Sequence, residues 1–156
     1  MYYQFKREQF VHADIKTVWD FASSPSNLKE ITPKHMGFQI TTPNTTEKMY
    51  PGMIITYKVS PLLNIPMNWM TEITHVEPLS FFIDEQRMGP YKMWHHQHLF
   101  EEKQGGVIMT DIVTYIPPYG LLGDIVNWLI IKRQLSSIFA YRFDAMDRIF
   151  PAKNNT

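Results

Sequence analysis

The spacing of hydrophobic and polar residues divides the chain into a strand-rich stretch flanked by two helical segments. From residue 36 to residue 115, short runs rich in Ile, Val, Thr, Phe, Tyr and Trp alternate with turn residues, as in a meandering antiparallel sheet. This pattern predicts six strands, near residues 37–41, 53–59, 67–76, 80–87, 91–101 and 107–115. Apolar and polar side chains also alternate between Tyr3 and Val11, which predicts a further strand at the start of the chain.

Two short helices are predicted after the first strand. Asp14 is a candidate N-cap, because apolar residues follow it at helical spacing up to Ala22. Ser24 is a candidate cap for a second short helix, in which Pro25 takes the first helical position. Thr32 and the proline after it should end that segment.

A long helix is predicted at the other end of the chain, where apolar residues recur at helical spacing from residue 121 to residue 150. Its length corresponds to about seven turns. One strand, two short helices, six strands and a long helix form an α+β pattern. The simplest arrangement lays the long helix across one face of a curved antiparallel sheet. We expect a single domain over residues 1–150 and a flexible tail over residues 151–156.

The composition excludes several kinds of site and partner. The chain of 156 residues has no Cys, which excludes disulfides, thiol nucleophiles and thiolate zinc sites. Fifteen basic residues balance fifteen acidic ones, so no net charge favours nucleic acid. No apolar run has the roughly 18 residues that a membrane span requires, so we expect no stable membrane insertion. We expect a soluble cytoplasmic protein that is a monomer or a weak homodimer.

Histidines and an aspartate are predicted to meet on one face of the sheet. His96 and His98 share a face of the predicted strand at 91–101. In one register of the hairpin with the strand at 107–115, His98 lies opposite Asp111. A shift of two residues places His96 opposite Asp111 instead. Both registers predict a His–Asp pair on the inner face.

Five short motifs are distributed over most of the chain. They are Val18-Trp19-Asp20-Phe21, Ser24-Pro25-Ser26-Asn27-Leu28 followed by Thr32-Pro33, Asp84-Glu85-Gln86, Gly89-Pro90-Tyr91 leading into Trp94-His95-His96, and Phe139-Ala140-Tyr141-Arg142. With the order of elements, they resemble the START and Bet v 1-like (SRPBCC) superfamily, in particular its stand-alone bacterial ligand-binding and polyketide-cyclase-like members. The resemblance implies a helix-grip fold, in which a curved seven-stranded antiparallel sheet wraps around the C-terminal helix. That superfamily includes lipid carriers, hormone receptors and cyclases, so the resemblance is specific for the fold and says little about chemistry.

Polar side chains on the inner face of the sheet mark a candidate cavity. A buried imidazole or carboxylate without a partner costs about 1 to 3 kcal/mol, so these groups should contact water, a ligand or one another. A filled core would also explain the aromatic and Met side chains, but the resemblance favours a cavity. The candidate ligand-binding residues are Tyr57, Trp69, Trp94, His96, His98, Asp111 and Arg142. The aromatic members would supply contact area, and the His, Asp and Arg members would orient the ligand.

We expect the chain to bind a hydrophobic or amphipathic small molecule, such as a lipid or an aromatic, polyketide-like metabolite. One alternative is a cyclase or dehydratase in which His96 or His98, polarised by Asp111, acts as general acid and base. Another is a regulatory or protein-interaction module with a vestigial pocket. No nucleophile motif and no glycine-rich phosphate loop is present in the sequence, which favours binding over catalysis.

A metal site is the remaining alternative. His96 and His98 share a face, and Asp111 or His75 offers a third ligand. A His–Asp hydrogen bond explains the same residues, so we expect neither a metal nor another cofactor. We expect the charged run at 84–87 to be a solvated strand end, the alternative being that one of its carboxylates enters the mouth of the cavity.

Overall fold

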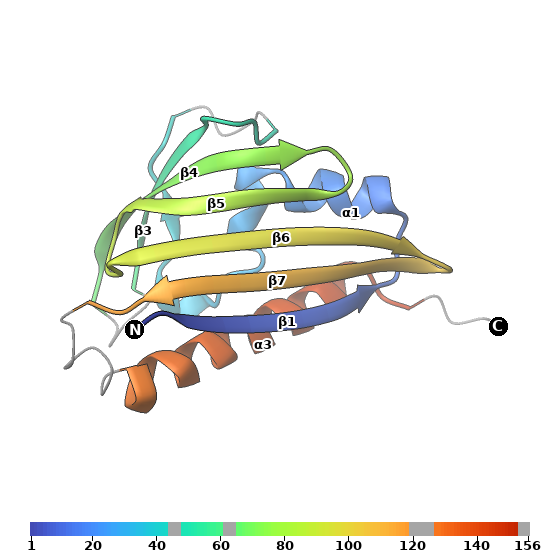
Figure 1. Cartoon of the computed structure of the whole chain (residues 1–156). Coiled ribbons are helices and arrows are strands. Elements are labelled where there is room, and N and C mark those ends of the chain that lie inside the picture. The colour runs from blue at the N-terminus through green and yellow to red at the C-terminus, as the bar shows by residue number, and fades with distance from the viewer. Residues whose placement is uncertain (44–47, 61–64, 119–126, 153–156) are drawn as a thin grey trace.

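Seven antiparallel strands form one sheet in the order β1-β7-β6-β5-β4-β3-β2 (Figure 1). The structure is a computed structural model that describes residues 1–43, 48–60, 65–118 and 127–152. The strands are β1 (Tyr3–Val11), β2 (Gln39–Ile40), β3 (Ile54–Val59), β4 (Met67–Glu77), β5 (Phe81–Met88), β6 (Met93–Lys103) and β7 (Gly106–Ile116). All seven predicted strands are therefore present, and the predicted strand at 37–41 is reduced to two residues.

The helices lie on one face of this sheet. They are α1 (Ile15–Ala22), η1 (Pro25–Lys29), η2 (Lys34–Met36), η3 (Asn127–Ile131) and α3 (Lys132–Ile149). The first helix packs against β6 and β7, and α3 runs alongside β1 (Figure 1). Residues 121–126, where the terminal helix was predicted to begin, lie outside the described residues. Among the described residues, no helix combines the length and apolarity that crossing a bilayer requires.

Of the two predicted cap residues of the short helices, only one makes a side-chain cap hydrogen bond. The Asp14 side chain accepts a hydrogen bond from the Thr17 backbone N–H at 2.9 Å, which confirms it as the N-cap of α1. Ser24 occupies the N-cap position of η1, as predicted, but its side chain makes no cap hydrogen bond. Its hydroxyl instead donates to the backbone oxygen of Asp20 at 2.7 Å, because the preceding helix leaves that acceptor free. Pro25 does occupy the start of η1, as expected.

The pairing of β5, β6 and β7 places the predicted polar residues on one face. His98 lies opposite Asp111 across β6 and β7, which confirms the first of the two registers. On the other side of β6, Asp84 of β5 lies opposite His96. Gly105 makes the tight turn before β7 possible, since its φ of +84° is unfavourable for residues with a Cβ.

An irregularity in β4 changes which side chains face inward. Ile73 pairs with Asp84 and His75 pairs with Ile83, so Thr74 is an extra residue in the ladder. The bulge moves His75 to the outer face, where it is exposed, whereas Ile73 is buried. The interpretation of His75 as an inward residue and a third metal ligand is therefore wrong. Strict alternation predicted its direction, and a one-residue insertion reverses alternation.

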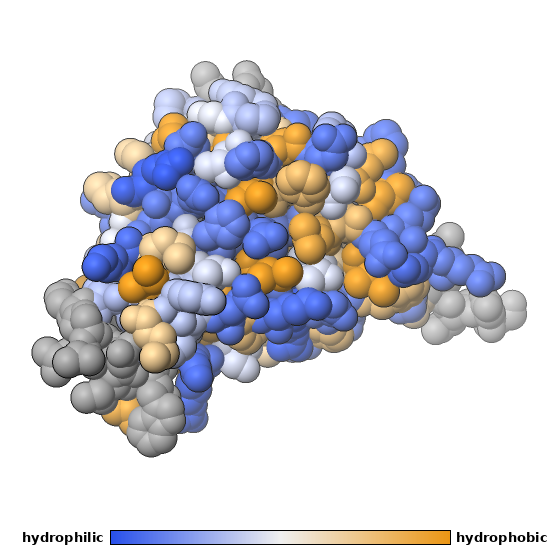
Figure 2. Space-filling model, viewed as in Figure 1, coloured by the Kyte–Doolittle hydropathy of each residue, from blue (hydrophilic) through white to orange (hydrophobic). Residues whose placement is uncertain are grey.

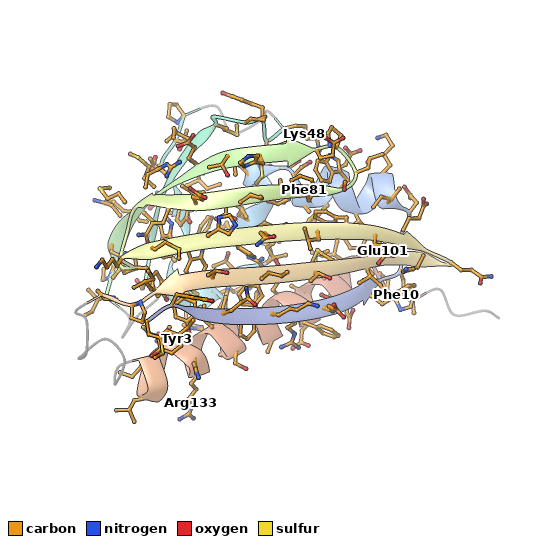
Figure 3. The ribbon with its side chains drawn as sticks, viewed as in Figure 1. Tyr3, Phe10, Lys48, Phe81, Glu101 and Arg133 are labelled. Atoms are coloured by element: carbon orange, nitrogen blue, oxygen red, sulfur yellow. The ribbon has the colours of Figure 1, made fainter. Side chains whose placement is uncertain are left out.

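The outer face of the sheet is mostly hydrophilic, with scattered apolar side chains (Figure 2). Exposed side chains such as Phe10 of β1 and Glu101 of β6 belong to it (Figure 3). Arg87 forms ion pairs there with Glu72 at 2.6 Å and with Glu85 at 3.2 Å. These two members of the charged run at 84–87 are solvated, as expected, and pairs this exposed contribute about 0 to 1 kcal/mol each.

Candidate functional site

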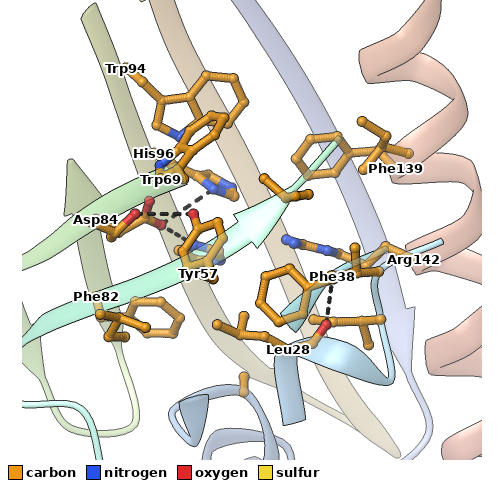
Figure 4. A pocket seen from close by; sticks show the side chains of 18 of the residues that line it. Leu28, Phe38, Tyr57, Trp69, Phe82, Asp84, Trp94, His96, Phe139 and Arg142 are labelled. Atoms are coloured by element: carbon orange, nitrogen blue, oxygen red, sulfur yellow. Dashed lines mark hydrogen bonds and ion pairs between the residues drawn. The ribbon is translucent and has the colours of Figure 1, made fainter. Parts of the chain in front are cut away.

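A cavity of about 150 Å³ lies between the inner face of the sheet and the helices (Figure 4). Its wall is mainly aliphatic and aromatic and belongs to the buried hydrophobic core. An apolar cavity of about 150 Å³ accommodates one benzene ring, so the space suits at least one aromatic ring. The side chains around it therefore leave room for a small molecule.

The structure brings the seven predicted residues to this region. Six line the cavity, and they come from β3, β4, β6 and α3. They are Tyr57, Trp69, Trp94, His96, His98 and Arg142. Asp111 stands behind the two histidines, in contact with both, and does not form part of the cavity wall. The sequence therefore predicted the location of these residues, and their role toward a ligand stays a prediction.

Asp84 completes the site, as in the alternative that one carboxylate of the run at 84–87 enters the cavity, although it was not among the predicted site residues. The expectation that the whole run at 84–87 is solvated is wrong for this residue, whose side chain is 15% exposed and lines the cavity. The signal was present in the sequence, because Phe82 is an apolar residue two positions earlier and shares a strand face with Asp84. The structure buries Phe82 and directs both side chains inward.

His96 and His98 are held between two carboxylates. Their ring centroids are 3.7 Å apart. Asp111 Oδ1 accepts a hydrogen bond from His96 Nε2 at 2.9 Å and lies 3.1 Å from His98 Nδ1. On the opposite side, Asp84 Oδ2 accepts from His98 Nε2 at 2.8 Å and lies 3.4 Å from His96 Nδ1. Each carboxylate thus faces one nitrogen of each ring.

Arg142 connects this cluster to the terminal helix. Its Nη1 lies 3.2 Å from Asp111 Oδ1, and its guanidinium carbon is 4.9 Å from the centroid of the Phe139 ring. The contact with Phe139 follows from helical spacing, since Phe139 lies one turn before Arg142 on α3. The Nε of Arg142 is buried and has no hydrogen-bond partner among the described residues. The side chain therefore has an unused donor beside the cavity.

The ionisable groups of the cluster shift one another's pKa values. Burial alone would raise the pKa of Asp84 and of Asp111, but the histidines and Arg142 outweigh burial and lower both pKa values, that of Asp111 well below its usual range. Burial and the neighbouring His98 lower the pKa of His96. Burial opposes the charged form of His98 too, but its two carboxylate partners raise its pKa. These directions favour the ionised forms of Asp84 and Asp111, the charged form of His98 and the neutral form of His96.

Aromatic side chains form the wall next to the cluster. The Trp69 ring stacks on Tyr57 with centroids 6.0 Å apart and meets Trp94 edge-on at 5.4 Å. The hydroxyls of Tyr57 and Thr71 share a hydrogen bond of 3.1 Å, and burial raises the pKa of Tyr57 so that the phenol stays neutral. The indole Nε1 of Trp69 is buried and has no hydrogen-bond partner in the described part of the chain. A ligand acceptor would satisfy this donor.

Comparison with known proteins by sequence identifies no relative. No protein-family model matches the chain, and no curated protein matches it. Solved structures do resemble it. The di-domain ARO/CYC protein BexL from the BE-7585A biosynthetic pathway has a TM-score of 0.70 over 97% of this chain and 51% of BexL, at 14% identity.

Two smaller proteins match over nearly their whole length. The major latex-like protein 151 of Panax ginseng has a TM-score of 0.66, 8% identity, and coverage of 96% of this chain and 98% of its own. Ara h 8.0201, a Bet v 1-like allergen, has a TM-score of 0.59, 15% identity, and coverage of 94% and 98%. The chain therefore has the helix-grip fold of the Bet v 1-like (SRPBCC) proteins, as the sequence motifs implied.

Proposed function

We propose that the chain binds a small molecule with an aromatic or aliphatic body and at least one hydrogen-bond acceptor, in the cavity between the sheet and α3. The observation that carries this proposal is an apolar cavity of about 150 Å³ lined by Trp69, whose buried indole Nε1 has no hydrogen-bond partner among the described residues. An unsatisfied buried donor costs about 1 to 3 kcal/mol, which a ligand acceptor would recover. The apolar wall favours the body of such a ligand, and the donor fixes its orientation.

Apolar burial alone supports modest affinity. Burying about 300 Å² of apolar surface contributes on the order of 7 kcal/mol. Association costs at least about 4 kcal/mol in lost freedom of motion. Selectivity then depends on the polar donors, which here are Trp69 Nε1 and Arg142 Nε.

Binding accounts for the cluster better than acid–base catalysis does. Every ring nitrogen of His96 and His98 lies within 3.4 Å of a carboxylate oxygen. A general base needs a nitrogen within hydrogen-bond reach of the substrate proton, and here all four nitrogens face protein carboxylates. An open cavity also argues against a vestigial pocket.

The Trp69→Phe variant tests this proposal. With 2-naphthol as probe, we expect the wild-type chain to bind and the variant to bind about fivefold to tenfold more weakly, because one net hydrogen bond of about 1 kcal/mol is lost. Naphthalene has no acceptor, so its affinity should be nearly the same for both proteins. Isothermal titration calorimetry measures all four affinities.

Trp19→Phe is the matched control, because Trp19 is buried in the core and does not line the cavity. It should leave the affinity for 2-naphthol unchanged. Absence of saturable binding of either probe to the wild-type chain would contradict the proposed function. Equal losses for 2-naphthol and naphthalene in Trp69→Phe would contradict the role of the indole N–H.

A further inference from the structure

The three inward side chains of Asp84, His96 and His98 combine two imidazoles and one carboxylate, a ligand set that divalent transition metals such as Zn²⁺ and Fe²⁺ accept. We infer that these residues form a metal-binding site in the wall of the cavity. This inference revises the expectation from the sequence, in which Asp84 had no place among the ligands. It concerns the metal ion alone and does not depend on the proposed small-molecule binding.

The spacing of the three groups suits a single ion. Their ligand atoms all lie within 4.8 Å of one another. Asp84 Oδ2 is 2.8 Å from His98 Nε2 and 3.4 Å from His96 Nδ1. Ligands that bind Zn²⁺ at about 2.0 to 2.2 Å lie roughly 3 to 3.5 Å apart around it, so only small shifts are needed. Their separation in the sequence does not prevent this, because Asp84 lies opposite His96 in the sheet and His98 follows on the same face.

Asp111 orients both histidines for this role. Its Oδ1 lies 2.9 Å from His96 Nε2 and 3.1 Å from His98 Nδ1, the nitrogens that do not face Asp84. A carboxylate that accepts from the outer nitrogen of a ligating histidine fixes the tautomer and the ring orientation. Here one carboxylate does this for two rings, which directs His96 Nδ1 and His98 Nε2 toward Asp84.

Arg142 determines which side of the rings receives the cation. Its guanidinium lies 3.2 Å from Asp111 Oδ1 and so repels a metal ion from that carboxylate. Asp84 lines the cavity and Asp111 does not, so an ion beside Asp84 would keep its remaining coordination positions toward the cavity (Figure 4). A bound dication replaces the proton between His98 Nε2 and Asp84, and that proton leaves to solvent. Together with Asp84, Asp111 and Arg142, the ion would give the site a net charge of +1, which favours an anionic oxygen ligand.

Titration of the chain with Co²⁺, after metal removal and without a histidine tag, tests the site. We expect one Co²⁺ per chain with visible absorption bands, and displacement by Zn²⁺. Asp84→Asn and His96→Gln should each lower the affinity by more than about 100-fold, and Asp111→Asn by about 10- to 100-fold. His95→Ala is the matched control, because His95 contacts Glu85 on the outer face and should not affect the affinity. Circular dichroism verifies that each variant is folded.

The wild-type chain provides a second measurement that does not rely on folded variants. In proton NMR, Zn²⁺ should shift the imidazole signals of His96 and His98 and leave those of His12, His35, His75 and His95 in place. Absence of stoichiometric Co²⁺ binding, binding that Asp84→Asn leaves intact, or shifts confined to the other histidines would overturn the inference. None of these outcomes affects the proposed function, because the naphthol titrations are performed in the presence of a chelator.

Discussion

Asp111→Ala is expected to lower the free energy of unfolding by about 3 to 5 kcal/mol. The carboxylate is buried, with a side chain only 6% exposed, and it contacts His96, His98 and Arg142. Removing it leaves the buried Arg142 guanidinium without this counter-ion and leaves His96 Nε2 and His98 Nδ1 without an acceptor. Breaking a buried ion pair on one side costs more than the pair itself contributes, because the remaining charge stays desolvated. Urea unfolding monitored by circular dichroism, with a chelator present, measures the change.

Asp144→Ala is the control for this prediction. Asp144 lies on α3, as does Arg142, but its side chain is exposed. Its replacement should change the free energy of unfolding by no more than about 0.5 kcal/mol. A loss of less than about 1 kcal/mol in Asp111→Ala would mean that the cluster is hydrated in solution, and would contradict its burial.

Ala22→Trp is expected to abolish measurable binding of 2-naphthol, a loss of at least about tenfold in affinity or 1.4 kcal/mol. Ala22 ends α1, lines the cavity and is half-buried. An indole at this position occupies space that the probe needs, since the whole cavity is only about 150 Å³. Part of the new side chain can still reach solvent, so the fold should tolerate it. Calorimetric titration at matched protein concentration measures the loss.

Ser136→Trp introduces the same side chain outside the cavity. Ser136 is exposed on α3 and does not line the cavity. This variant should bind 2-naphthol as the wild-type chain does. If Ala22→Trp and the wild type bound 2-naphthol with equal affinity, the probe would bind elsewhere on the molecule. Urea unfolding of both Trp variants verifies that they are folded.

Alternation of side chains allowed much of the fold and part of the site to be predicted from the sequence. Strand period places His96 and His98 on one face, and the pattern of the hairpin partner predicts that this face is the inner one, as the structure confirms. The turn at Gly105 limited the β6–β7 register to two choices, one of which placed His98 opposite Asp111 as observed. Regular patterns of this kind are local, so one sequence is enough to identify them.

What could not be predicted depends on contacts between distant segments. The bulge at Thr74 reverses the direction of His75, and no local residue type signals it. Strand period places Asp84 on the same face as Phe82, but only pairing with β6 places it beside His96. The cavity itself depends on the distance between α3 and the sheet, which side-chain packing over the whole core determines.

Intermolecular nuclear Overhauser effects between 2-naphthol and the methyl groups of the wild-type chain test the central claim most directly, that an open cavity between the sheet and α3 holds a small molecule. We predict contacts from the naphthol ring protons to Ile55, Ile73 and Met109, all of which line the cavity. Ile112 does not line it and should show none. Contacts only to residues outside the cavity, or no saturable contacts at all, would contradict the account.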